Sequence, residues 1–162
     1  MNKILLIDGH SILNRAFYGV PPLTNFEGLH TNAVYGFINI MLKSLEDEHA
    51  DYIAVAFDLK APTFRHEMFA EYKGTRKPMP QELHEQVPVI KEVLAAMTIP
   101  VITLEGYEAD DILGTLAKRC QRDGFEVSIL SGDRDLLQLA DEHIKIRMPK
   151  TVKGQTSIEN YY

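Results

Sequence analysis

The feature that most constrains this chain is a set of four short apolar runs in which hydrophobic and polar residues do not alternate. Each run is rich in Ile, Val and Leu, and longer stretches with helical spacing separate the runs. Strands without alternation are covered on both faces, as in the parallel sheets of α/β domains. We therefore predict an α/β fold with a mainly parallel central sheet. The four predicted strands are Ile4–Ile7, Ile53–Phe57, Val101–Leu104 and Val127–Leu130.

Helix signals lie between the predicted strands. Thr31 can cap a helix that presents apolar side chains as far as Leu45. Pro80 can open a second helix that reaches Leu94, and Pro88 should kink or split it. The alternation of strands and helices again favours an α/β domain.

A third predicted helix begins near Glu108 and ends at Gly124, whose tolerance of positive φ suits a C-terminal cap. Cys120 lies in an apolar stripe of this helix, which indicates a buried helix face and no redox chemistry. Because Cys120 is the only cysteine, no disulfide can form within the chain.

The length and composition fit one globular domain that spans residues 1–162. No apolar run approaches the ~18 residues that cross a bilayer, and the first residues lead into a strand pattern without a cleavage site. We therefore expect a cytoplasmic protein. The turn-like Lys153-Gly154 and the polar, aromatic residues after it suggest that the chain ends inside a longer protein.

Acidic residues follow the carboxyl end of each predicted strand. In an open α/β sheet the ligand site lies beyond these ends, so side chains far apart in sequence should meet in one crevice. The seven acids that we expect there are Asp8, Asp58, Glu108, Asp110, Asp111, Asp133 and Asp135. They account for a charge of −7 in a chain of net charge −6, so the remaining residues carry +1, and an acidic total does not exclude a nucleic-acid partner.

Seven carboxylates cannot share a crevice as bare ions, because like charges a few ångströms apart oppose folding. Cations must compensate, and all-oxygen ligands favour Mg²⁺ or Mn²⁺ over Zn²⁺. Two such ions ~4 Å apart can clamp the attacking and leaving oxygens of a displacement at phosphorus. The pattern therefore predicts phosphodiester hydrolysis.

Taken singly, each acid also has a structural interpretation. Asp133 can cap the turn Arg134–Leu139, and Asp110 and Asp111 are ordinary first-turn acids that favour a helix dipole. Asp8 is harder to explain in this way, because a charge directly after an apolar strand is costly without a partner. The joint pattern at four strand ends is what favours a metal site.

The segment from Leu59 to Met79 is polar, basic and aromatic, and it is long for a plain connection. Lys73 and Arg76 lie three residues apart and could reach one phosphodiester, and Tyr72 could stack on an unpaired base. The alternative is a solvated basic loop. Two further candidates for phosphate contacts are Arg15 and Arg65.

In its motifs the chain resembles the 5′ nucleases, or flap endonucleases, and most of all the 5′–3′ exonuclease domain of bacterial DNA polymerase I. The matching blocks keep the order of that family over nearly the whole chain. They are Leu5-Leu6-Ile7-Asp8-Gly9-His10-Ser11, Thr31-Asn32-Ala33-Val34-Tyr35-Gly36-Phe37, Phe57-Asp58, Thr63-Phe64-Arg65-His66-Glu67, Tyr72-Lys73-Gly74-Thr75-Arg76, Gly106-Tyr107-Glu108-Ala109-Asp110-Asp111 and Ser131-Gly132-Asp133-Arg134-Asp135.

The resemblance implies a PIN-like, three-layer α/β fold, a Mg²⁺ site at the seven acids and a helical arch that bears Lys73 and Arg76. It implies cleavage of DNA at 5′ ends, nicks and flaps, removal of RNA primers in replication and repair, and a location near the nucleoid. The family continues into further aspartates for a second ion and a duplex-binding element, which this sequence lacks, so the resemblance implies a weak nuclease in isolation.

Three other interpretations remain open at this point. A DNA-binding fragment without catalysis would use the acids only structurally. A PIN-type ribonuclease would use a similar acidic crevice on RNA. A phosphate-accepting receiver domain also places acids at strand ends, although its one acceptor would not need so many carboxylate neighbours.

Overall fold

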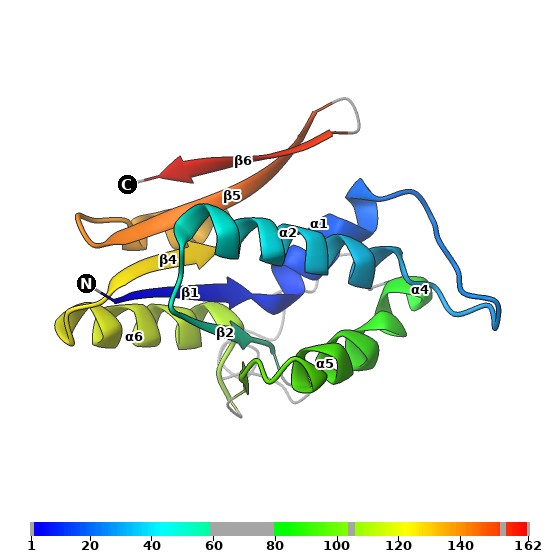
Figure 1. The fold of residues 1–162 in the computed structure, drawn as a ribbon, viewed down its shortest axis with the longest axis horizontal. Coiled ribbons are helices and arrows are strands. Elements are labelled where there is room, and N and C mark those ends of the chain that lie inside the picture. The colour runs from blue at the N-terminus through cyan, green and yellow to red at the C-terminus, as the bar shows by residue number, and fades with distance from the viewer. Residues whose placement is uncertain (1, 59–79, 104–105, 153–154, 162) are drawn as a thin grey trace.

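The computed structural model describes residues 2–58, 80–103, 106–152 and 155–161. A six-stranded sheet with the order β3-β2-β1-β4-β5-β6 forms its centre (Figure 1). All neighbouring strands pair in parallel except β5 and β6, so the prediction of a mainly parallel sheet is confirmed. The strands are β1 (Lys3–Asp8), β2 (Tyr52–Ala56), β3 (Val101–Ile102), β4 (Glu126–Leu130), β5 (Ile144–Val152) and β6 (Gln155–Tyr161).

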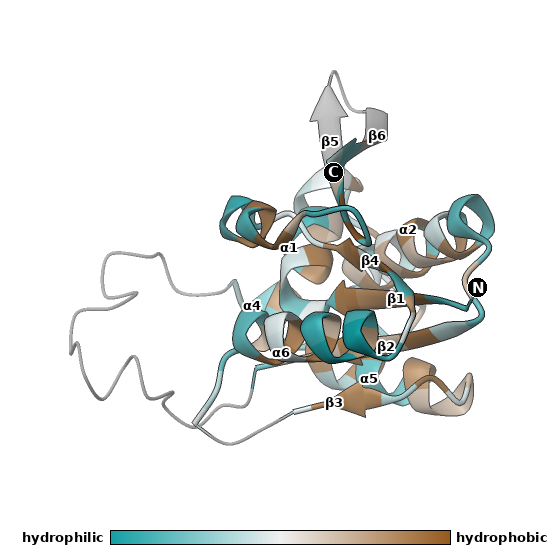
Figure 2. Cartoon of the chain, turned by 90° about the vertical axis from the view of Figure 1, so that its left-hand side faces the viewer, coloured by the Kyte–Doolittle hydropathy of each residue, from teal (hydrophilic) through white to brown (hydrophobic). Residues whose placement is uncertain are grey.

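Helices cover both faces of this sheet. The main helices are α1 (Gly9–Gly19), α2 (Asn32–Glu48), α5 (Gln86–Ala96) and α6 (Ala109–Arg122), and the short ones are α4 (Gln81–His84) and the 3-10 helix η1 (Arg134–Leu139). Figure 2 shows the apolar strands between these layers. None of the helices in the described ranges is both long enough and apolar enough to cross a membrane.

Strand β1 shows why its sequence does not alternate. Leu5 and Ile7 pack into the cluster formed with α1, α2 and α5, whereas Leu6 packs into the cluster formed with α6, β4 and β5. All three side chains are at most 1% exposed. Since successive side chains of a strand point to opposite faces, only a strand with apolar layers on both sides can bury all of them.

The predicted helices are present, with two adjustments. The helix predicted from Pro80 is interrupted at Glu85, between α4 and α5. This position lies three residues before Pro88, which has no backbone N–H to bond the carbonyl of the preceding helical turn. Gly124 follows α6 with φ +90° and ends it as predicted. Thr31 is the N-cap residue of α2, but its hydroxyl makes no capping hydrogen bond.

Three elements had no counterpart in the sequence analysis. Helix α1 follows β1 without a loop, because Asp8 itself is its N-cap. Strand β5 pairs with β4 from Ile144 to Arg147, and its later residues form an antiparallel hairpin with β6. The turn predicted at Lys153-Gly154 lies outside the described residues.

Candidate metal centre at the carboxyl ends of the strands

The parallel order β3-β2-β1-β4 brings the loops that carry the predicted acids to one edge of the sheet. Asp8 ends β1, and Asp58 follows β2 by two residues. Glu108 is the N-cap of α6, and Asp133 is the N-cap of η1 after β4. Asp8 is thus at once the end of a strand and the cap of a helix, and Glu108 and Asp133 cap helices after the loops that follow β3 and β4.

Asp8 is the most buried aspartate of this group, with 6% of its surface exposed. Its Oδ2 accepts a hydrogen bond from Ser131 Oγ at 2.9 Å, and its Oδ1 accepts one from the Ser11 N–H at 3.4 Å. Burial raises the pKa of Asp8 to about 7 and outweighs the two hydrogen bonds, which lower it, while the nearby charges of Asp58 and Asp133 add smaller increases. Asp58 and Asp133 therefore both lie within electrostatic reach of Asp8.

Asp58 joins this group to the start of α6. Its Oδ1 accepts a hydrogen bond from the N–H of Ala109 at 2.5 Å, so the loop after β2 is tied to the first turn of α6. The Asp58 side chain is half-buried. A helix N-terminus stabilises a nearby carboxylate, which partly offsets the repulsion from Asp8.

The first turn of α6 holds a second set of acids. Ligand oxygens of Glu108, Asp110 and Asp111 all lie within 4.8 Å of one another. Glu108 is 3% exposed, and the two aspartates are half-buried. Asp111 Oδ2 also accepts the Glu108 N–H at 3.1 Å as part of a capping box, so this first-turn acid has a structural role in α6.

The loop after β4 also contains a predicted site acid that caps a helix. Asp133 Oδ1 accepts the Asp135 N–H at 2.9 Å, which confirms the predicted cap of Arg134–Leu139. The Asp133 side chain is nevertheless half-buried and close enough to Asp8 to raise its pKa. Asp135 is exposed. The capping and metal-binding interpretations are therefore compatible.

The donor set of this edge suits a hard divalent cation. It consists of carboxylate oxygens from Asp8 at the end of β1 and from the loops after β2, β3 and β4, and the charges of Asp58 and Asp133 raise the pKa of Asp8 by less than burial does. A cation among them would reverse this repulsion. An acidic edge of this kind can hold ions that activate a phosphodiester toward water.

Of the predicted basic residues, only Arg15 is within the described ranges. Its guanidinium lies beside the loop of Asp133, since a Cβ atom added to Gly132 would be 3.5 Å from Arg15 Nη2. Lys73, Arg76, Arg65 and Tyr72 lie outside the described residues. A further cation, the Lys91 ammonium, lies 5.2 Å from the centre of the ring of Phe57, the residue that precedes Asp58.

The sequence analysis gave no role to Ser11 or Ser131, although both stand in the quoted motif blocks. The structure places the Ser131 hydroxyl on the Asp8 carboxylate, and Ser11 Oγ accepts the N–H of Gly132, the residue before Asp133, at 2.7 Å. Their proximity to Asp8 and Asp133 in the motifs was the available signal. Only the fold shows that the two motifs meet.

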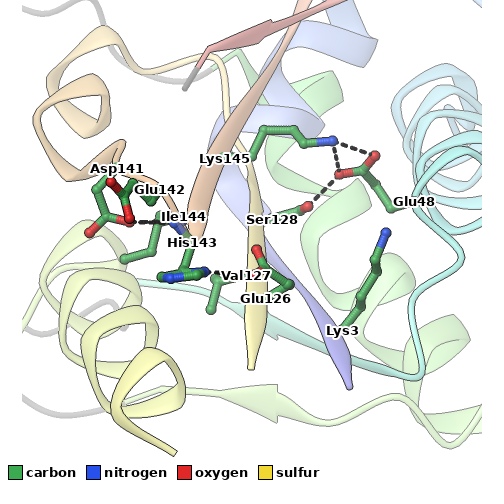
Figure 3. A pocket seen from close by; sticks show the side chains of 10 residues that line it. All are labelled: Lys3, Glu48, Glu126, Val127, Ser128, Asp141, Glu142, His143, Ile144 and Lys145. Atoms are coloured by element: carbon green, nitrogen blue, oxygen red, sulfur yellow. Dashed lines mark hydrogen bonds and ion pairs between the residues drawn. The ribbon is translucent and has the colours of Figure 1, made fainter. Parts of the chain in front are cut away.

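A cavity of about 230 Å³ lies at the opposite end of the sheet, around Lys3, Glu126 and Lys145 (Figure 3). Several of its charges are paired, among them Glu126 with His143 at 2.7 Å. Buried Glu48 accepts hydrogen bonds from Ser128 and, at 2.8 Å, from Lys145, as Figure 3 shows. Arg147 binds the same carboxylate at 3.3 Å. This network ties α2 to β4 and β5 and is structural.

Comparisons with known proteins agree with this geometry. The family model of the 5′–3′ exonuclease, N-terminal resolvase-like domain matches residues 3–162. DNA polymerase I of Bacillus caldotenax is 53% identical over 159 residues, and that of Bacillus subtilis is 52% identical over 159 residues. In both cases the match covers 98% of this chain and 18% of the relative, so the chain spans about a fifth of the relatives' length.

A solved structure has the same fold. The flap endonuclease of bacteriophage T5, in a complex with DNA and metal ions, superposes with a TM-score of 0.67 at 22% identity. The superposition covers 90% of this chain and 54% of that one. The PIN-like, resolvase-like layering predicted from the sequence is thereby confirmed.

Proposed function

This chain belongs to the family of the 5′–3′ exonuclease N-terminal, resolvase-like domain, and from that membership we propose that it is the metal-binding part of a nuclease that hydrolyses DNA at 5′ ends and 5′ flaps. The observation that carries the proposal is the buried Asp8, whose carboxylate lies within electrostatic reach of Asp58 and Asp133 from the loops after β2 and β4. A carboxylate with a pKa raised by burial and by like charges is a frequent mark of a functional site.

The proposed cofactor is Mg²⁺ or Mn²⁺, with two ions in the complete nuclease. Their ligands come from the seven predicted acids, Asp8, Asp58, Glu108, Asp110, Asp111, Asp133 and Asp135. When bound, such ions polarise the phosphodiester and neutralise the charge that develops on its oxygens. The contribution of the chain is to hold these carboxylates in place before substrate arrives, since Asp8, Asp58 and Asp111 are each fixed by hydrogen bonds.

The proposed substrate contacts are basic. Arg15, beside the Asp133 loop, is placed to bind a phosphate next to the acids. Lys73 and Arg76 would position and neutralise the phosphate that is cut, with Tyr72 and Arg65 on the approaching single strand. These four roles rest on the motif resemblance and the family match.

The proposed partners are DNA with 5′ flaps, nicks or 5′ ends, and RNA primers paired to DNA. The relatives named DNA polymerase I support a polymerase region in the natural protein, and the bound DNA of the phage T5 flap endonuclease supports a DNA substrate. Primer and flap removal in the cytoplasm, near the nucleoid, is the corresponding cellular role.

Cleavage of a labelled 5′-flap DNA with Mg²⁺ or Mn²⁺ tests the proposal. The assay uses this chain and full-length Bacillus subtilis DNA polymerase I, each with changes equivalent to Asp133→Asn and, separately, Lys73→Ala. We expect loss of cleavage for the first variant, because it removes a metal ligand, and a fall of at least about 100-fold for the second, because it removes a charge that stabilises the transition state.

Asp123→Asn is the matched control, since Asp123 is an exposed aspartate beyond the other end of α6. It should leave cleavage unchanged. Flap binding without metal-dependent cleavage in either protein would contradict the proposal and favour a non-catalytic DNA-binding fragment. Faster cleavage of single-stranded RNA than of flap DNA would favour a PIN-type ribonuclease instead.

A further inference from the structure

Ser131 connects two of the acidic loops through one hydroxyl group. It directly follows β4, and its side chain is fully buried. Its Oγ donates a hydrogen bond to Asp8 Oδ2 at 2.9 Å and accepts one from the Asp133 N–H at 3.0 Å. When Asp8 is ionised, its carboxylate can only accept and the Asp133 backbone N–H can only donate, so both directions are determined.

Ser11 forms the second part of this connection. Its Oγ accepts the Gly132 N–H at 2.7 Å and lies 3.4 Å from Ser131 Oγ. Its own N–H donates to Asp8 Oδ1. The start of α1 and the loop between β4 and η1 are therefore held together by two adjacent hydroxyls, with Asp8 on one side and Asp133 on the other.

A buried serine often does no more than satisfy its own polar group. Here the two partners of Ser131 are the side chain of one proposed metal ligand and the backbone of another. Rotation of the Asp8 carboxylate would break the first bond, and displacement of the Asp133 loop would break the second. The geometry of the two acids relative to each other thus depends on this one side chain.

We propose that Ser131 is a positioning residue that fixes the Asp8 carboxylate and the Asp133 loop in the arrangement that binds the metal ion, with Ser11 in a supporting role. This inference rests on the proposed function. Groups that orient metal ligands through hydrogen bonds raise metal affinity, and their removal costs about 10- to 100-fold.

The test measures Mn²⁺ binding to the whole 162-residue chain by electron paramagnetic resonance, with circular dichroism to check that each variant is folded. Ser131→Ala should weaken Mn²⁺ binding about 10-fold or more, and Ser131→Thr, which keeps the hydroxyl, should restore most of it. If Ser131→Ala does not fold, Ser131→Cys replaces it, because a thiol fills a similar space and is a weak donor.

Ser44→Ala is the matched control. Ser44 is also fully buried, but its hydroxyl has no hydrogen-bond partner in the described part of the chain, and it lies on α2. It should leave Mn²⁺ affinity unchanged. Equal weakening by Ser44→Ala and Ser131→Ala would overturn the inference, because it would reflect general loss of packing.

Asp8→Asn separates this inference from the proposed function. Loss of Mn²⁺ binding in Asp8→Asn, together with a change of less than about threefold in folded Ser131→Ala, would overturn the role of Ser131 and leave the metal centre standing. Unchanged Mn²⁺ binding in Asp8→Asn would overturn the metal centre itself.

Discussion

Replacement of Asp8 by Asn should make the metal-free protein more stable at neutral and alkaline pH. Asp8 is buried, and its pKa is raised to about 7 by burial and by the charges of Asp58 and Asp133. Above that pH the folded protein must hold an ionised carboxylate that would be more stable in water. Asn has nearly the same shape and no charge, so it removes this cost.

The size of the effect follows from the pKa of Asp8 in the two states. The pKa rises from 3.8 to about 7, and each unit is worth about 1.4 kcal/mol, so ionised Asp8 lowers the free energy of unfolding by about 4 kcal/mol. Because the pKa of Asp8 is higher in the folded than in the unfolded state, its contribution to the stability of the parent protein is fully present below about pH 4. This contribution is lost as the pH rises through 7. The Asn amide has one acceptor oxygen where the carboxylate has two, so it cannot accept from both the Ser11 N–H and the Ser131 hydroxyl, and the expected gain is nearer about 3 kcal/mol.

Urea unfolding in EDTA, at about pH 5 and about pH 8, measures the difference in free energy of unfolding between parent and Asp8→Asn. The advantage of Asp8→Asn should grow between the two pH values, and Mn²⁺ should abolish it by stabilising only the parent. For the control Asp123→Asn, at an exposed position, the difference in free energy of unfolding from the parent should not grow between the two pH values. A difference that stays constant with pH in EDTA would refute the view that buried charge at Asp8 destabilises the metal-free fold.

Three further changes test packing and ion pairing elsewhere in the fold. Gly36→Ala would place a methyl group 2.7 Å from the Ala16 side chain and should lower the free energy of unfolding by about 1–3 kcal/mol. Gly114→Ala is the comparison: its methyl group would make an ordinary van der Waals contact with Leu139, and the change should be neutral or stabilising by up to about 1 kcal/mol. Arg147→Met removes a guanidinium that binds buried Glu48 and should cost about 3 kcal/mol. Urea unfolding measures all three, and an unchanged midpoint for Gly36→Ala or Arg147→Met would contradict the corresponding contact.

Local patterns were sufficient to predict most of the fold. The four apolar runs became strands β1 to β4, and the helices near Thr31, Pro80 and Glu108 formed close to the predicted residues. These signals are local because burial on both faces of a strand, or on one face of a helix, leaves its period in the sequence. Helix α1 and strand β5 had signals as well, in the spacing of Ile12, Leu13 and Ala16 and the alternation of Ile144, Ile146 and Met148, which the sequence analysis did not use.

The sequence alone determined which acids follow the carboxyl ends of the strands, and parallel strands carry these ends to one edge of the sheet. Only the tertiary structure decided how they are held. The bond from Ser131 to Asp8 spans 123 positions of the chain, and that from Ala109 to Asp58 spans 51. The pKa of Asp8 likewise depends on how deeply the fold buries it and on which charges come near, and these depend on contacts between distant segments that no local pattern encodes.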